Sequence, residues 1–158
     1  MKISHMVKIT GQPVAKGRPR FDRRGHAYTP EKTVCWEHRA AAIIRAAIGS
    51  PKYDQPLKMQ ITAYFERPKR LLTRKSSPNR IHHTSKPDAD NIGKIVADAM
   101  TMAGVVRDDS IINQMMITKY YAAKDAPAEV VILLDSWEDE HQQNDRFTKK
   151  QSAIERCK

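Results

Sequence analysis

Leu57-Lys-Met-Gln-Ile-Thr-Ala-Tyr-Phe-Glu66 is the clearest structural signal in the chain, because apolar and polar residues alternate along it. Side chains of a strand point alternately to its two faces, so this pattern predicts a half-buried β-strand. Three further stretches, at residues 6–10, 111–121 and 128–134, also have strand character. The last contains Val130-Val-Ile-Leu-Leu134, which is apolar throughout, and we expect it to be a central strand or one covered on both faces.

Two segments have the apolar period of helices. Thr29-Pro30 predicts the start of the first, with threonine as N-cap and proline at the first helical position, and Gly49-Ser-Pro51 ends it. The second spans Asp90–Ala103, with Asp90 as N-cap and Gly104 as C-cap. We therefore predict an α+β fold, a small mixed sheet of about four strands packed with two main helices.

The length of 158 residues fits one compact domain. We expect this domain to span residues 6–135, followed by a peripheral helix or flexible tail at residues 136–158. Residues 1–5 precede a second methionine, and we treat them as a possible vector remnant without structural weight.

The sequence also indicates a compartment. No apolar run approaches the roughly 18 residues of a membrane span, and the N-terminus lacks the layout of a signal peptide. Cys35 and Cys157 are the only cysteines and lie far apart, so they form neither a disulfide framework nor a metal-ligand spacing. We expect a cytoplasmic protein that does not engage a membrane.

The net charge of +10 is distributed unevenly. Residues 1–87 contain 19 Lys and Arg against 5 Asp and Glu, a balance of +14, whereas residues 88–158 contain 9 against 13, a balance of −4. This asymmetry indicates a polyanion bound by the first part and metal ions held by the second. A merely solvated basic surface is the alternative.

Many of the cations fall in two loops that are rich in Gly, Pro or Ser. The first, residues 11–29, also carries Phe21, and the second, residues 67–87, is unusually long for a compact domain. Such loops suit phosphate contacts and base stacking, and we expect them to be mobile without nucleic acid. The adjacent His82 and His83 do not have a spacing that would aim both at one zinc ion. The expected nucleic-acid contacts are Lys16, Arg18, Arg20, Arg23, Arg24, Lys69, Arg70, Arg74, Lys75 and Arg80.

The densest set of reactive side chains is Lys86-Pro-Asp-Ala-Asp-Asn-Ile-Gly-Lys94, completed by Asp108-Asp109. Asp88 and Asp90 can face one ion if the chain is extended up to the helix start, and Lys94 lies one turn inside the helix on the side of Asp90. Three convergent carboxylates can hold Mg²⁺ or Mn²⁺, because these hard ions prefer oxygen ligands.

The third carboxylate is separated from the first two by the length of the helix. Asp108 and Asp109 alternate and therefore point to opposite faces, so one of them is the expected ligand. Because the helix is about 20 Å long, that ligand reaches the first two only if residues 104–109 run straight back along the helix or a partner subunit completes the site. The alternative is a charge ladder of Asp90, Lys94 and Asp98 on a solvated helix face.

The pattern Asp-x-Asp-Asn-x-x-Lys at residues 88–94, followed by Asp-Ala in a short helix, Gly104 and Asp108-Asp109, resembles the RusA family of Holliday-junction resolvases. The segments at residues 12–20 and 27–30 are similar to phage and prophage members, and the resemblance spans roughly residues 7–134. It implies a small homodimeric endonuclease, bacterial or phage-encoded, that cuts four-way DNA junctions with Mg²⁺ or Mn²⁺ in recombination and repair.

The resemblance also implies roles for particular residues. Asp88, Asp90 and Asp109 would be the metal carboxylates and Lys94 the catalytic lysine, a choice that selects Asp109 over Asp108. Two other functions stay open. One is a branched-DNA-binding protein whose acids form only surface ladders, and the other is a sugar transferase that holds a nucleotide–metal complex. The +14 part is hard to explain in a transferase, and the sequence contains no phosphate-binding glycine loop.

Overall fold

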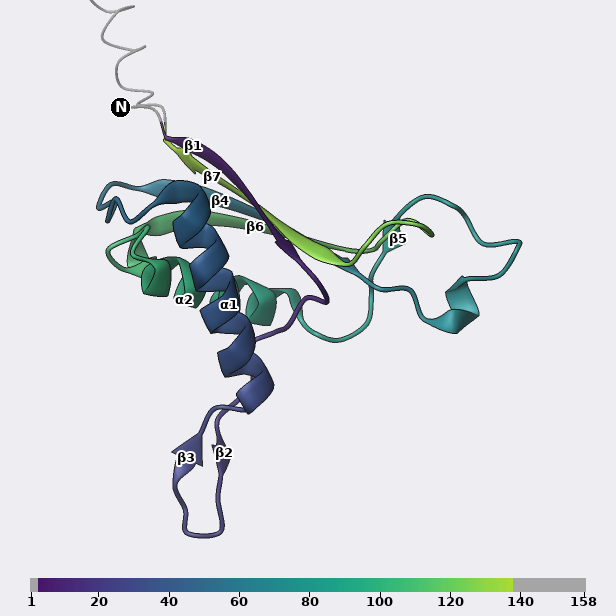
Figure 1. Ribbon diagram of the computed structural model, residues 1–158, viewed down its shortest axis with the longest axis horizontal. Coiled ribbons are helices and arrows are strands. Elements are labelled where there is room, and N and C mark those ends of the chain that lie inside the picture. The colour runs from purple at the N-terminus through teal and green to yellow at the C-terminus, as the bar shows by residue number, and fades with distance from the viewer. Residues whose placement is uncertain (1–2, 138–158) are drawn as a thin grey trace, which may run out of the picture.

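The computed structural model describes residues 3–137, in which two long helices cover one face of a five-stranded mixed sheet (Figure 1). The α+β class and the two main helices are confirmed. The elements are β1 (Ser4–Thr10), β2 (Arg20–Phe21), β3 (Ala27–Tyr28), α1 (Glu31–Ile48), β4 (Leu57–Phe65), η1 (Lys69–Leu71), β5 (Ile81–His82), α2 (Ala89–Ala103), η2 (Asp109–Ile111), β6 (Ile112–Tyr121) and β7 (Glu129–Ser136).

The strand order in the sheet is β1-β7-β4-β6-β5, with β4 and β6 parallel and the other neighbours antiparallel. The apolar strand β7 lies between β1 and β4, as its composition predicted. Along β4 the alternating pattern is realised: the side chains from Leu57 to Phe65 that share its apolar face are at most 3% exposed. The short β5 pairs only with Tyr120 and Tyr121 of β6, so the first part of β6 lies at an edge of the sheet.

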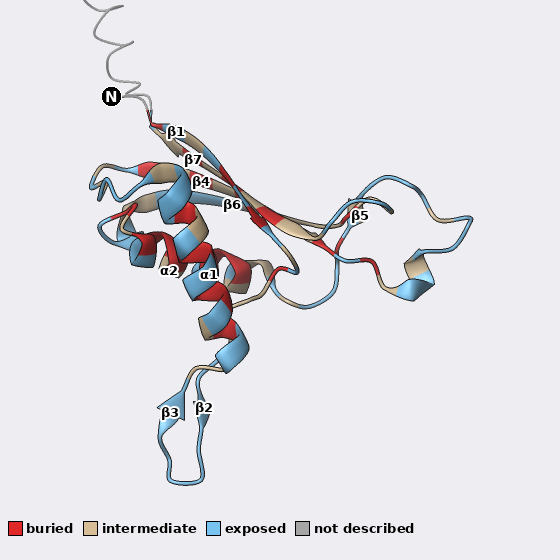
Figure 2. Ribbon diagram, viewed as in Figure 1, coloured by how far each residue is buried: buried red, intermediate tan, exposed pale blue. Residues whose placement is uncertain are grey.

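The core lies between the sheet and the helices, where the buried residues gather in Figure 2. In α1, Trp36, Ala40 and Ile44 are buried as expected, whereas Ala47 is exposed. Helix α2 packs on α1 and β6. It comes close to the sheet at Gly93, where an added Cβ would lie 2.5 Å from the sulfur of Met115.

Several predicted boundaries are wrong. Strand β1 begins at Ser4, Ile3 is only 3% exposed, and the His5 Nε2 atom lies 3.1 Å from the Tyr53 hydroxyl, so residues 3–5 do have structural weight. Helix α1 has Pro30 rather than Thr29 at the N-cap position, because the chain becomes helical one residue later than predicted. Most of the predicted tail at residues 136–158 falls outside the described residues.

The first basic loop also differs from expectation, because it contains a two-stranded hairpin, β2–β3, that projects from the body beside the start of α1 (Figure 1). Every residue from Arg18 to Tyr28 is exposed. Within residues 3–137, no helix has the length and apolar character needed to cross a bilayer.

Candidate functional site

The first turn of α2 carries two of the predicted carboxylates. Asp88 occupies the N-cap position in an extended conformation, with φ −70° and ψ 149°, and Asp90 follows in the first turn. The prediction that Asp90 is the N-cap is wrong, because the N-cap lies two residues earlier, at Asp88. The Asp88 side chain makes no capping hydrogen bond and both aspartates are exposed, so their oxygens face solvent where a hard cation could bind them.

Lys94 lies beside Asp90, with 3.3 Å between its Nζ and the Asp90 Oδ2. The side chains are 64% and 63% exposed, so this pair contributes little to stability and leaves both groups accessible. The expected placement of Lys94 on the side of Asp90 is confirmed. The alternative ladder does not continue to Asp98, whose carboxylate pairs instead with Lys16 at 2.6 Å.

Lys16 is therefore not a free surface cation. Its ammonium group bridges Asp98 of α2 and Glu37 of α1, with the Glu37 oxygen at 2.5 Å, and its backbone N–H donates to the carbonyl of Asn91. Burial opposes the charged form, but the hydrogen bonds to Asp98 and Glu37 outweigh it and raise the pKa of Lys16. These contacts tie the segment before the hairpin to the start of α2.

Asp108 and Asp109 have different local roles. Asp108 is the N-cap of η2, where its carboxylate accepts a hydrogen bond of 2.9 Å from the backbone N–H of Ser110. Hydrogen bonds from the side chain and backbone of Ser110 lower the pKa of Asp108. Asp109 is the exposed first residue of η2. The difference leaves Asp109 the more available of the two as a ligand.

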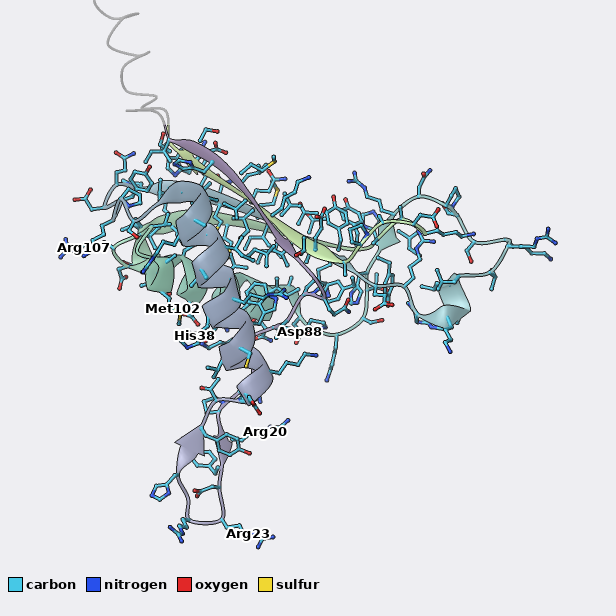
Figure 3. All side chains as sticks on the ribbon, viewed as in Figure 1. Arg20, Arg23, His38, Asp88, Met102 and Arg107 are labelled. Atoms are coloured by element: carbon cyan, nitrogen blue, oxygen red, sulfur yellow. The ribbon has the colours of Figure 1, made fainter. Side chains whose placement is uncertain are left out.

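A single copy of the chain does not bring Asp109 to the other two carboxylates. Lys119, near the end of β6, donates to the carbonyl of Pro87 at 2.7 Å, which places Asp88 at that end of the strand. Asp109 precedes Ile112, the first residue of β6. Ile112 and Lys119 are separated by roughly 23 Å along an extended strand. Figure 3 shows Asp88 and Arg107 at opposite ends of α2.

The reason is the path of the chain after α2. Instead of running back along the helix, residues 105–107 pair with Tyr53, whose N–H donates to Val105 and whose carbonyl accepts from Arg107. Val105 and Val106 are buried, so these β-branched side chains are part of the hydrophobic core. Across the described residues no group of three or more His, Cys, Asp or Glu side chains is placed to hold a metal ion.

The β2–β3 hairpin carries several of the arginines that we predicted to contact DNA. The Asp22 carboxylate closes the turn by accepting hydrogen bonds from the backbone N–H groups of Arg24 and His26, at 2.7 and 2.9 Å. Hydrogen bonding, first from the His26 backbone, lowers the pKa of Asp22. Phe21, on the first strand, is 71% exposed. An ordered turn with free cations and an exposed aromatic ring suits contact with nucleic acid.

The second basic segment is organised by Arg67, which is 5% exposed. Its guanidinium group donates to the carbonyls of Ala122 and Ser77, each at 2.7 Å, and to that of Asn79. The period-two pattern of β4 continues inward from Phe65 to Arg67, and this signal could have identified Arg67 as structural. The other predicted cations of this segment are exposed: Lys69, Arg70, Arg74, Lys75 and Arg80.

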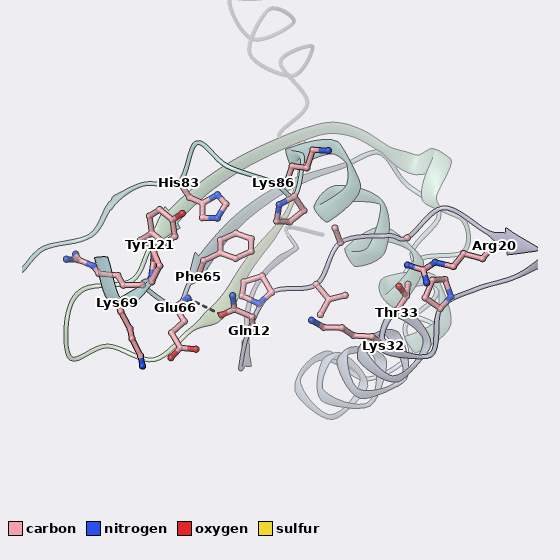
Figure 4. Close-up of a pocket in the computed structure, with 18 residues that line it drawn as sticks. Gln12, Arg20, Lys32, Thr33, Phe65, Glu66, Lys69, His83, Lys86 and Tyr121 are labelled. Carbon is pink, nitrogen blue, oxygen red and sulfur yellow. Dashed lines mark hydrogen bonds between the residues drawn. The ribbon is translucent and has the colours of Figure 1, made fainter. Parts of the chain in front are cut away.

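An open cleft of about 790 Å³ lies between the hairpin base, the end of β4 and the segment that precedes Asp88 (Figure 4). Arg20 and Lys69, both predicted contacts, line it together with Lys32 and Lys86, which were not among the expected nucleic-acid contacts. Lys32 lies at the start of a helix, where solvated lysines are common, and Lys86 had been considered as part of the acidic motif. The cleft joins the two cation-rich segments beside α2.

Comparisons with known proteins find a matching family model and a relative. A family model described as Endodeoxyribonuclease RusA matches residues 10–133. A relative from Bacillus subtilis (strain 168), "Uncharacterized protein YqaN", is 29% identical over 136 residues, which cover 80% of this chain and 94% of the relative. The matched family region contains the acidic residues of α2 and η2, the hairpin and the second basic segment.

Proposed function

The chain belongs to the RusA family of endodeoxyribonucleases, and from this membership we propose that it resolves four-way DNA junctions by metal-dependent hydrolysis of phosphodiester bonds. The observation that carries the proposal is the exposed first turn of α2. There Asp88, Asp90 and Lys94 come directly after Lys86 and Pro87, which line the cation-rich cleft. Linear or branched DNA held by those cations would present a phosphate to the two carboxylates.

The donor set fits Mg²⁺ or Mn²⁺ in its chemistry, since Asp88, Asp90 and Asp109 offer exposed carboxylate oxygens. A single copy of the chain brings only Asp88 and Asp90 together, at the start of α2. We therefore propose that Asp109 comes from a second copy, so that the functional unit is a homodimer with two sites. Two sites related by a two-fold axis also match the pair of strands that must be cut in a four-way junction.

The exposed edge of β6 offers a route to this dimer. Residues 112–118 are paired on one side only, and Met116 in this stretch is 52% exposed. Unpaired edges tend to pair with another strand. Antiparallel pairing of two β6 strands centred on Gln114 would set Asp109 of one copy opposite Lys119 of the other. Lys119 contacts the carbonyl of Pro87, so Asp109 of the second copy would approach Asp88.

The residues of the chain would have two roles: some would position the metal and the DNA, and others would stabilise negative charge on the phosphate. Asp88, Asp90 and the second copy's Asp109 would hold the metal, which when bound supplies Lewis-acid activation and offsets charge on the scissile phosphate. Lys94 would donate to a phosphate oxygen as negative charge develops. The hairpin arginines and the lysines around the cleft would bind flanking phosphates without reading sequence, so affinity should fall steeply with salt.

The test is incubation of an end-labelled four-way junction with wild-type protein and Mg²⁺, compared with Asp88→Asn. Loss of cleavage with retained junction binding is expected for the variant. The matched control is Asp125→Asn, which removes an exposed carboxylate in the turn between β6 and β7, outside α2 and η2, and should cut normally. Equal cleavage by wild type and Asp88→Asn would contradict the assignment.

A second candidate is a branched-DNA-binding protein without catalytic activity. The separation of Asp109 from Asp88 in one copy favours it, because the acids would then be surface charges only. Calorimetric titration with Mn²⁺ distinguishes the two functions: the nuclease should bind the ion with an affinity that Asp88→Asn and Asp109→Asn each weaken. A non-catalytic protein should show no saturable binding of Mn²⁺, either as wild type or as the variants.

A further inference from the structure

We propose that the cleft beside α2 receives one unpaired nucleotide of the branched substrate, with its base in the apolar part and its phosphate among the lysines. This inference rests on the proposed function and deepens it, because it assigns the feature by which the protein would distinguish branched from fully paired DNA. The volume of about 790 Å³ lies within the range of sites that enclose small organic ligands.

Charge around the cleft favours a phosphate. Arg20, Lys32, Lys69 and Lys86 reach it from four separate parts of the chain, against the single acid Glu66. Figure 4 shows these cations around the opening rather than in one cluster. Cations that surround a concave surface raise the local concentration of an anionic ligand and bind its phosphate from more than one side.

The inner wall of the cleft is apolar and aromatic. Val14, Pro30 and Pro87 line it beside Phe65 and Tyr121, which are drawn with it in Figure 4. Flat apolar walls accept the face of any base, which suits a protein that binds DNA by its branching rather than by its sequence.

One buried polar atom in this wall is unsatisfied. His83 is 6% exposed and its ring lies between Phe65 and Tyr121, with centroids 4.1 and 4.5 Å away. Its Nδ1 atom has no hydrogen-bond partner among the described residues. Burial, with the nearby Lys119 ammonium group, lowers the pKa of His83, which favours the neutral ring. Buried polar atoms are nearly always paired, so a small movement of the surrounding side chains that opens this atom to the cleft would let the edge of a base supply the missing partner.

The position of the cleft connects it with the cleavage chemistry. Pro87 lines the cleft and Asp88 follows it directly. A nucleotide held in the cleft would therefore present the adjoining phosphodiester to the start of α2. Removing a base from a paired duplex costs stacking and pairing energy, whereas a base opened at a branch point has already lost part of it. The cleft would accordingly fill on branched DNA and stay empty on linear duplex.

The test uses the full chain carrying Asp88→Asn, without divalent metal, so that binding is measured apart from cleavage. The probes are a four-way junction with 2-aminopurine beside the branch point and a duplex of the same sequence with 2-aminopurine at the same position. Binding to the junction should change the 2-aminopurine fluorescence, while binding to the duplex should not. An unchanged signal on the junction would overturn the proposal.

A cleft-filling variant supplies the matched comparison. Ala15 lines the cleft, so Ala15→Trp should abolish the fluorescence change and weaken junction binding about tenfold, in line with the energy of base–aromatic stacking. Duplex binding should be unchanged. Ala47→Trp, which adds the same ring at an exposed position of α1, should behave as the parent. Equal weakening on junction and duplex by Ala15→Trp would contradict a nucleotide-specific cleft.

His83→Phe tests the unpaired nitrogen separately. Phenylalanine keeps the aromatic stack and removes the buried polar atom, so the thermal midpoint should hold or rise while junction binding weakens. If junction binding is unaffected, His83 has only a packing role. Failure of wild-type protein to cut a junction would overturn the proposed function alone, since the fluorescence change requires no cleavage.

Discussion

Lys16 and Asp98 form an ion pair with 2.6 Å between Nζ and Oδ2, and this pair links the segment before the hairpin to the middle of α2. Glu37 shares the same ammonium group, and its side chain is only 8% exposed. We predict that Lys16→Met lowers the free energy of unfolding by about 1–3 kcal/mol, because it leaves a buried carboxylate without its partner. Urea titration at neutral pH measures the change; Lys52→Met is the exposed control.

The same ion pair should make stability depend on pH in the alkaline range. Because the pKa of Lys16 is raised above 10.5 in the folded protein, its contribution is fully present below that pH and is lost as pH rises through the folded value. The difference in unfolding free energy between wild type and Lys16→Met should therefore narrow above pH 10.5. A constant difference from pH 8 to pH 12 would contradict the role given to the ammonium group.

Arg67 should be essential for the fold of the second basic segment. Replacement by Met removes the donor for the carbonyls of Ala122, Ser77 and Asn79, of which the bond to Ala122 is buried and the other two are partly buried. We expect a loss of at least about 2 kcal/mol of stability. Arg70→Met, at an exposed position of the same segment, should change stability by no more than about 0.5 kcal/mol. Thermal unfolding followed by circular dichroism distinguishes these results.

Lys94→Ala should separate binding from catalysis. The exposed Lys94 ammonium group contributes little to stability, and its proposed work is done when charge develops on the phosphate. The single-turnover cleavage rate should fall about 100- to 1,000-fold, while junction affinity changes little. A parallel loss of binding would instead assign Lys94 to holding DNA.

The hairpin arginines should determine much of the salt dependence of binding. Each phosphate contact that is lost lowers the slope of log affinity against log salt by about 0.9. The double variant Arg23→Ala, Arg24→Ala should thus reduce the slope by about 2 on both junction and duplex DNA. Lys8→Ala, an exposed cation on β1, should leave the slope unchanged. An unaltered slope in the double variant would exclude the hairpin from the interface.

Mixed dimers test whether two copies share each metal site. If Asp88 of one copy works with Asp109 of the other, a heterodimer of Asp88→Asn and Asp109→Asn contains one site with both defects and one intact site. The two inactive variants, mixed and refolded together, should then nick one strand of the junction. A site built within one copy would be defective in both halves, and the mixture would stay inactive.

The sequence predicted those parts of the fold that follow from local periodicity. The alternation from Leu57 to Phe65 and the apolar run from Val130 to Leu134 each gave a strand in the expected place. The order of the strands in the sheet was not predictable, because it depends on contacts between residues far apart in the sequence. The parallel pairing of β4 with β6 is an example.

For the candidate site, the sequence predicted local neighbours but not how distant segments are arranged. Local spacing correctly placed Lys94 beside Asp90, one helical turn away. It could not show that residues 105–107 would pair with Tyr53 and keep Asp109 at the start of β6, away from Asp88. Nor could the sequence show that Lys16, an expected phosphate contact, would pair with acidic side chains from two helices.

The closed turn at Asp22 has a consequence for how protein and substrate adjust to each other. A flexible loop could mould itself to many junction geometries and would lose conformational freedom when it did so. The turn of this hairpin is already held by hydrogen bonds to the Asp22 carboxylate. The hairpin therefore loses less conformational entropy on binding and can change its shape less. Under the proposed function, the conformational adjustment on binding would therefore fall mainly on the DNA, whose arms would have to open around the hairpin.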